Sequence, residues 1–146
     1  SLRNFDAIYK IDRSTGDVLW IAGGEEGDYA LSDGETILFE RQHQFEVMPE
    51  GLLVFDNRVP EESSRAVEYE LSEDDGTARL VWEYLSEPPL FTMGFGDVQR
   101  LPNGNTLVDW SAQGRLEEVT PEGELVWSLG TALGAGFGYC EWFEVF

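Results

Sequence analysis

The sequence contains one histidine, His43, and one cysteine, Cys140, and these are its most chemically versatile side chains. A neutral imidazole nitrogen is a good nucleophile near pH 7 and can carry a transferred group between two substrates. A catalytic thiol needs a neighbouring base, and Cys140 has no histidine except the distant His43, so we expect a packed thiol. For His43 three roles stay open: a structural hydrogen bond to a neighbouring strand, a nucleophilic or ligand-contacting role, or service as a lone metal ligand.

The spacing of potential metal ligands does not indicate a metal site. The sequence has no Cys/His cluster of zinc-site spacing, and its single cysteine cannot form an intramolecular disulfide. The acidic runs GGEEGDYALSDGE (23–35) and SEDDG (72–76) do not fit the twelve-residue calcium loop with its fixed Gly and Glu positions. We therefore expect solvated acidic loops and no bound metal.

The charge balance is strongly acidic and limits the classes of partner. There are 29 acidic and 9 basic residues, for a net charge of −20, and Lys10 is the only lysine. Clustered Lys and Arg are needed to bind phosphates, so we expect neither a nucleic-acid partner nor an anionic membrane partner. Salt at about 1 M screens charges beyond about 3 Å. We interpret the composition as adaptation to high salt, with an ordinary acidic protein as the alternative.

The compartment stays open at this stage. No apolar run reaches the roughly 18 residues of a spanning helix, and no secretory signal is visible at the N-terminus. Ser1 is an unusual first residue, so a trimmed chain without its targeting segment is one interpretation. An extracytoplasmic location in a high-salt organism is compatible with these observations.

The chain contains a repeated pattern of a strand, a polar turn with glycine, and a second strand that ends in tryptophan. The three copies are IYKIDRSTGDVLW (8–20), RAVEYELSEDDGTARLVW (65–82) and RLEEVTPEGELVW (115–127). We expect the turn glycines to take positive φ, and the tryptophans to pack between blades. The glycines are Gly16, Gly76 and Gly123, and the tryptophans are Trp20, Trp82 and Trp127.

A second pattern precedes two of these copies and completes four-stranded units. It reads HQFEVMPEGLLVFDN (43–57) and GDVQRLPNGNTLVDW (96–110), each with two strands about a Pro-x-Gly turn. Four antiparallel strands in 40–50 residues with a recurring tryptophan are typical of a propeller blade. We therefore predict an all-β fold of about two and three-quarter blades. The expected parts are a half-blade (5–22), two blades (43–85 and 96–130) and a last strand (138–146).

A chain of this length is too short to close a propeller ring, which typically needs four to eight blades. Open blades expose strand edges and an apolar flank, which favours association. We expect a homodimer in which two copies close one six-bladed ring. The alternative is that the chain is a fragment of a longer protein.

Four segments together resemble the arylsulfotransferase (ASST)-like family, and most closely the C-terminal half of its six-bladed propeller. They are IDRSTGDVLWIAGG, RQHQFEVMPEGLLVFDN, SRAVEYEL and GDVQRLPNGNTLVDWSAQGRLEEVTPEGELVW. The resemblance covers nearly the whole chain. It implies sulfuryl transfer from an aryl sulfate to a phenolic acceptor, without a cofactor and without the nucleotide sulfate donor PAPS.

The resemblance also implies roles for particular residues. In enzymes of this kind a histidine of the central channel is transiently sulfated, and His43 is the natural candidate. Arg65 and Asn57 would then neutralise and hydrogen-bond the sulfuryl oxygens in the transition state. Gln42 could orient the imidazole ring. Arg41 and Arg100 are further candidates for substrate binding.

Some features of the sequence depart from the family pattern. Gln44 follows His43 where the family usually has an acidic residue, and Gly96 stands at the equivalent place in the next blade. Trp110 and Trp142 lie outside the repeat, and one of them could line the channel and stack on an aromatic ligand. Two function hypotheses therefore remain. One is an arylsulfotransferase-like enzyme, and the other is a non-catalytic half-propeller that self-assembles and binds a ligand or another protein.

Overall fold

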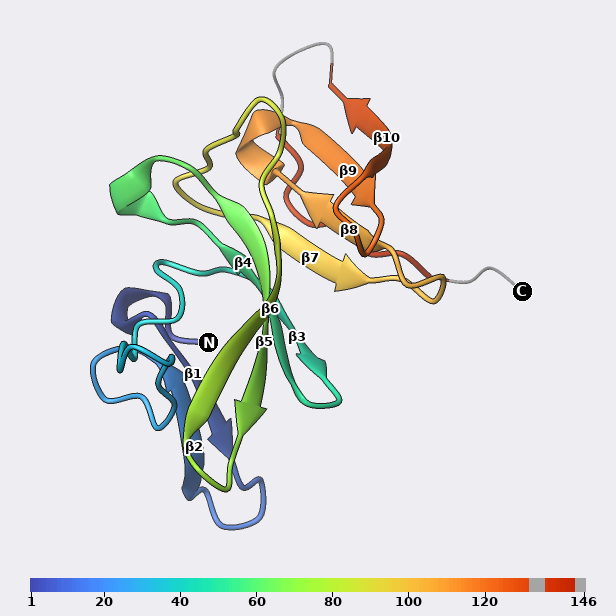
Figure 1. Cartoon of the computed structure of the whole chain (residues 1–146). Helices are drawn as coiled ribbons and strands as arrows, with labels where there is room; N and C mark the ends of the chain where they lie inside the picture. Colours follow the sequence, from blue (N-terminus) through green and yellow to red (C-terminus); the bar gives the residue numbers. More distant parts are fainter. Residues whose placement is uncertain (132–135, 144–146) are drawn as a thin grey trace.

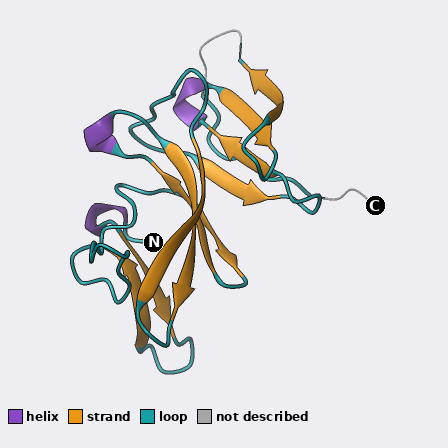
Figure 2. Ribbon diagram, viewed as in Figure 1, coloured by secondary structure: helices purple, strands orange, loops and turns teal. Residues whose placement is uncertain are grey.

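A computed structural model describes residues 1–131 and 136–143 of the chain and shows an all-β protein (Figures 1 and 2). Two four-stranded antiparallel sheets and one two-stranded sheet lie side by side. The strands are β1 (Ala7–Ile11), β2 (Val18–Gly23), β3 (Phe45–Met48), β4 (Gly51–Asp56), β5 (Arg65–Ser72), β6 (Thr77–Tyr84), β7 (Asp97–Arg100), β8 (Thr106–Asp109), β9 (Arg115–Val119) and β10 (Leu125–Gly130). The short 3-10 helices are η1 (Arg3–Phe5), η2 (Val59–Glu61) and η3 (Ser111–Gln113).

Each sheet is a meander in which strands adjacent in sequence are adjacent in space. The orders are β1-β2, β3-β4-β5-β6 and β7-β8-β9-β10. Gly16, Gly76 and Gly123 all have positive φ, between 66° and 82°, as the turn pattern predicts. We call the three sheets the half-blade (β1–β2), the first blade (β3–β6) and the second blade (β7–β10).

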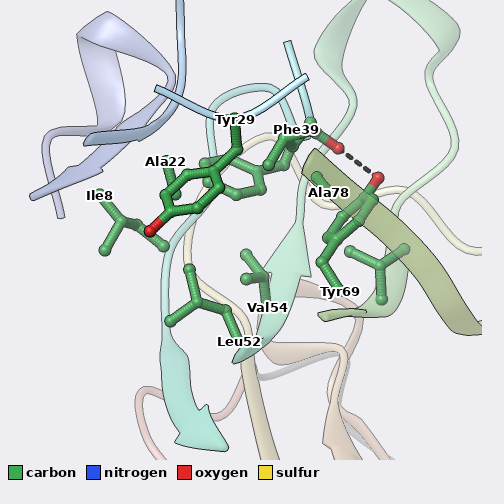
Figure 3. Packing of buried hydrophobic residues seen from close by; sticks show 10 residues of the cluster. Ile8, Ala22, Tyr29, Phe39, Leu52, Val54, Tyr69 and Ala78 are labelled. Carbon is green, nitrogen blue, oxygen red and sulfur yellow. Dashed lines mark hydrogen bonds between the residues drawn. The ribbon is translucent and has the colours of Figure 1, made fainter. Parts of the chain in front are cut away.

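One apolar core joins the half-blade to the first blade (Figure 3). Ile8 and Ala22 of the half-blade face Leu52, Val54 and other buried side chains of the first blade. The Tyr69 hydroxyl donates a hydrogen bond of 2.6 Å to the Leu38 carbonyl, so its polar end is satisfied inside this core.

A second apolar core joins the first blade to the second blade. Leu53 and Phe55 of β4 contribute to it, together with Val108 and Trp110 of the second blade. The rings of Phe55 and Trp110 pack edge to face, with centroids 5.6 Å apart. Because successive strand residues point to opposite faces, β4 supplies both cores in turn. This explains why its sequence, LLVF, is continuously apolar.

The repeated tryptophans occupy equivalent places in the three sheets, but their surroundings differ. Trp20 packs on the first core and Trp82 on the second core, as expected for packing between blades. Trp127 lies on β10 and is 42% exposed. The third tryptophan therefore has no following blade against it within the described part of the chain.

The expected last strand (138–146) is not formed in the part of it that the structure describes. Residues 136–143 carry no strand, and residues 144–146 lie outside the described residues. The segment is held by other bonds: the Trp142 N–H donates to Gln99 Oε1 at 2.8 Å, and Gln99 Nε2 donates to the Trp142 carbonyl at 3.2 Å. A side-chain amide on β7 thus replaces the backbone ladder that a strand would need.

Two glycines with positive φ give a test of this packing. A Cβ on Gly96 (φ 118°) would lie 2.1 Å from the Phe55 ring, whereas a Cβ on Gly104 (φ 88°) would meet nothing within 4 Å. We expect Gly104→Ala to lower the free energy of unfolding by about 1–2 kcal/mol through backbone strain. Gly96→Ala should cost about 1–3 kcal/mol more, because it also overpacks the second core. Urea unfolding in high salt measures both, and equal losses would contradict this account.

Candidate functional site

His43 lies two residues before β3, where the chain still pairs with β4. The His43 N–H donates to the Phe55 carbonyl at 3.1 Å, and the Phe55 N–H donates to the Gln44 carbonyl at 2.9 Å. These two bonds extend the sheet by two residues beyond β3. The backbone of His43 is therefore fixed at the end of the first blade, with its side chain directed toward the loop before β7.

The ring of His43 is held from both sides. Nδ1 lies 2.8 Å from Asn57 Oδ1, and the Phe95 N–H donates to Nε2 at 2.8 Å. The Asn57 amide group donates to the carbonyls of Thr92 and Phe95, at 2.8 and 2.9 Å, so its Oδ1 is the acceptor. This network requires a neutral ring with the proton on Nδ1 and the lone pair on Nε2.

The segment that caps Nε2 has an unusual backbone conformation. Phe95 has φ of 64° and is 61% exposed, and it stands between Gly94 and Gly96. Its ring lies 5.8 Å from that of His43, centroid to centroid. A left-handed conformation at a bulky residue is rare in proteins. Sequence reasoning missed the backbone of Phe95, and the Gly-Phe-Gly run at 94–96 was the available signal.

Arg65 lies on the other face of the first blade from His43. Asp56 and Asn57 are successive residues, so their side chains point to opposite faces. Asn57 binds His43, whereas Asp56 receives a 2.8 Å bond from Arg65 Nε. The guanidinium also donates to Glu83 at 2.7 Å. Burial works against the charge, but the two carboxylates more than offset this and raise the pKa of Arg65.

Gln42 and Arg41 contact the N-terminal segment. Gln42 is fully buried, and its Nε2 donates to Ser1 Oγ at 3.0 Å and to the Ala7 carbonyl at 3.1 Å. Arg41 has φ of 56°, and its N–H donates to Asp6 Oδ1 at 2.6 Å. These bonds anchor the segment before β1 and do not orient the imidazole of His43.

Arg100 and Trp110 lie between the two blades. The Arg100 guanidinium is ion-paired with Glu68 and lies over the Trp82 ring, 5.3 Å from its centroid. Trp110 is fully buried in the second core and donates to Glu117 at 2.7 Å. Trp110 therefore does not line a channel, because its position after β8 directs it into the space between the blades.

The end of the second blade carries a pair of buried acids instead of a histidine. Asp97 and Asp109 are register partners on β7 and β8, and both are buried. Arg115 does not neutralise them, because it forms an ion pair with Glu117 at 2.5 Å. Burial, reinforced by the charge of Asp109, raises the pKa of Asp97 to about 6.

The described residues hold no group of three or more His, Cys, Asp or Glu side chains that could bind a metal ion. In the same part of the chain, no helix is both long and apolar enough to span a membrane.

The fold places the chain in the class of all-β proteins built of stacked, propeller-like four-stranded blades. A family model described as Arylsulfotransferase (ASST) matches residues 1–132. The match covers most of the chain, and the chain therefore belongs to the arylsulfotransferase (ASST) family.

No curated protein matches the sequence. A similar solved structure is the crystal structure of a protein of unknown function from Bacteroides caccae, with 17% sequence identity and a TM-score of 0.40. The similarity covers 86% of this chain and 54% of that protein, so the chain spans about half of its length.

The Asn57 network gives a second prediction. Asn57→Ala removes the partner of His43 Nδ1 and of two carbonyls, so we expect the free energy of unfolding to fall by about 2–4 kcal/mol. The matched control is Asn103→Ala, at an exposed turn where Oδ1 accepts a 3.0 Å bond from the Asn105 N–H. The control should lose less than about 1 kcal/mol. Urea unfolding in high salt compares them, and a larger loss in the control would refute the assignment.

The buried acid Asp97 makes stability depend on pH. Its pKa is about 6 in the folded chain and ordinarily 3.8, so the folded state binds the proton more tightly. The contribution of Asp97 to the free energy of unfolding is therefore greatest below about pH 4. It is lost as the pH rises through about 6, and the full loss is up to about 3 kcal/mol. Asp97→Asn should match the wild type near pH 4 and exceed it at pH 7. Unfolding at both pH values tests this, with exposed Asp17→Asn as control; no gain at pH 7 would contradict it.

Proposed function

We propose that this chain is an arylsulfotransferase-like protein that transfers a sulfuryl group from an aryl sulfate to a phenolic acceptor through His43. The observation that carries the proposal is the bond from His43 Nδ1 to Asn57 Oδ1 in a chain of this family. A proton held on Nδ1 leaves the lone pair on Nε2, which is the form of the ring that can act as a nucleophile.

The proposed reaction has two displacements at sulfur. In the first, the Nε2 lone pair forms an N–S bond while the S–O bond to the aryl group breaks, and the aryl oxide leaves and takes a proton from solvent. In the second, the oxygen of the deprotonated acceptor phenol attacks sulfur and the N–S bond breaks. The imidazole then recovers its lone pair, and the histidine itself carries the group, so the reaction uses no cofactor.

Asn57 acts in this scheme as a positioning residue. It is fully buried and its three hydrogen bonds hold the ring, the Thr92 carbonyl and the Phe95 carbonyl in one arrangement. Attack by Nε2 requires the Phe95 N–H to move away from it, because that bond occupies the lone pair. The Phe95 N–H, once released, is a donor close to the transferred sulfuryl oxygens.

The second candidate function is a non-catalytic half-propeller that assembles and binds a ligand or another protein. The bond from the Phe95 N–H to Nε2 favours it, because both ring nitrogens of His43 are then used within the fold. The ion pairs of Arg65 and Arg100 favour it too, since neither cation is left without an acidic neighbour. Cations already neutralised by carboxylates attract an aryl sulfate weakly.

Incubation with p-nitrophenyl sulfate and excess phenol, in about 2 M KCl to screen the acidic surface, separates the two candidates. If His43 carries the group, the wild type releases nitrophenol, and a rapidly quenched sample shows one sulfuryl group on the peptide with His43. His43→Gln should lower turnover at least about 10³-fold and remove the label. Ser14→Ala, at the exposed β1–β2 turn, is the control that retains both.

Either of two results would rule out sulfuryl transfer through His43. A folded wild type with no nitrophenol release and no labelled peptide, or turnover that persists in His43→Gln, would rule out the proposed role of His43. Release that is lost in His43→Gln without any labelled peptide would instead indicate a direct, single-displacement transfer.

A further inference from the structure

The two contacts between neighbouring blades in this chain follow one rule. In each, the sheet face that carries the repeated tryptophan packs against the opposite face of the next sheet. Trp20 faces the first blade, and its Nε1 donates to Glu73 in the β5–β6 turn at 3.1 Å, while its ring packs on Tyr29 of the loop between β2 and β3. Trp82 faces the second blade, where Arg100 lies over its ring. The chain thus uses the same kind of interface twice.

The tryptophan face of the second blade is the third copy of this surface. It forms a groove of about 520 Å³ whose lining includes the apolar residues Leu107, Leu116, Trp127 and Trp142 and the polar residues Asn103, Glu118 and Glu141. Leu129 belongs to the same face, because it pairs in register with Leu116, and it is 50% exposed. Glu118 accepts the Trp127 indole N–H, so the polar end of this ring is already satisfied. Within the described part of the chain, Leu107 and Leu116 are buried, and Trp127 and Leu129 are exposed apolar side chains of this face.

The half-blade lies at the other end of the stack (Figure 1), and its outer face is of the opposite kind. Lys10 is the register partner of Trp20, and Glu68 is the register partner of Trp82. Lys10 therefore occupies in the half-blade the position that Glu68 occupies in the first blade. Ile11 therefore corresponds to Tyr69, the next residue of β5. Tyr69 is 2% exposed in the first core, whereas Ile11 is 54% exposed.

Other residues of the half-blade share the face of Ile11. Alternation along β1 and β2 places Tyr9, Leu19 and Ile21 there, opposite Trp20. Leu19 is 55% exposed. Tyr9 and Ile21 are partly buried, so Ile11 and Leu19 are the exposed apolar side chains of this face, which corresponds to the face that the first blade buries in the first core.

We propose that a second copy of this chain covers both surfaces, with the Trp127 face of one copy packed on the Ile11 face of the other. The argument is continuity: the two free faces are the two halves of an interface that the chain already forms twice. A two-fold dimer makes the contact twice and closes, so no apolar face is left to recruit a third copy. Each copy carries a net charge of −20, so the contact forms when salt screens their repulsion.

Two variants test the proposal, and each places a charged side chain in one of the two faces. Leu129→Glu blocks the Trp127 face and Ile11→Glu blocks the Ile11 face, and both residues are about half exposed in the single chain, so each variant should fold. Light scattering in about 2 M KCl should give twice the 16.5 kDa chain mass for the wild type. Each variant alone should be monomeric, because every contact in its homodimer contains a blocked face.

Mixing the two variants gives the decisive measurement. A mixed pair has one contact in which both faces are intact, so an equimolar mixture should regain dimer that neither variant forms alone. Val47→Glu is the control, because Val47 is 71% exposed and belongs to neither face; it should remain dimeric. A monomeric wild type in high salt would overturn the proposal. So would an Ile11→Glu variant that still dimerises, which would show that the Trp127 faces pair with each other. Neither result depends on whether His43 carries a sulfuryl group.

Discussion

Strand β4 is the element on which the rest of the structure depends, because it is buried on both of its faces. Leu52 and Val54 belong to the core shared with the half-blade, while Leu53 and Phe55 belong to the core shared with the second blade. All four side chains are 1% exposed or less. At roughly 1.5–3 kcal/mol for each fully buried side chain, these four residues contribute about 6–12 kcal/mol to the two cores. The stacking of the three sheets follows from this one strand.

The same alternation along β4 decides which residues can act together. Beyond Phe55 the strand continues into Asp56 and Asn57, which keep pointing to opposite faces. Asp56 binds Arg65 on one face, and Asn57 binds His43 on the other. Residues that are close in sequence therefore serve different purposes. The salt bridge joins β4 to β5 within the first blade, and the amide network joins the first blade to the loop that leads into β7.

The charge of the chain and its apolar ends act in opposite directions. The acidic excess, −20 on one chain, favours separation of copies at low ionic strength. The uncovered faces at the ends of the stack favour association, since Trp127 and Ile11 are both substantially exposed. Salt shifts the balance toward association, because it weakens the repulsion between exposed charges and does not weaken the burial of apolar surface. The dimer proposed above is therefore expected to depend on salt.

Much of this protein was determined by the sequence alone. The strands, the turns at Gly16, Gly76 and Gly123, and the family resemblance all follow from local patterns, because a period of two and a glycine in a turn need only neighbouring residues. The sequence also singled out His43 and Asn57, but with Asn57 as a partner of the sulfuryl oxygens, whereas in the fold Asn57 Oδ1 is bonded to the ring of His43. Tertiary structure decided the rest. It placed Trp110 in a core, paired Arg65 away from His43 and brought the backbone of Phe95 onto Nε2. These outcomes depend on which sheet faces meet, and that is set by packing between strands far apart in the chain, which no local pattern records.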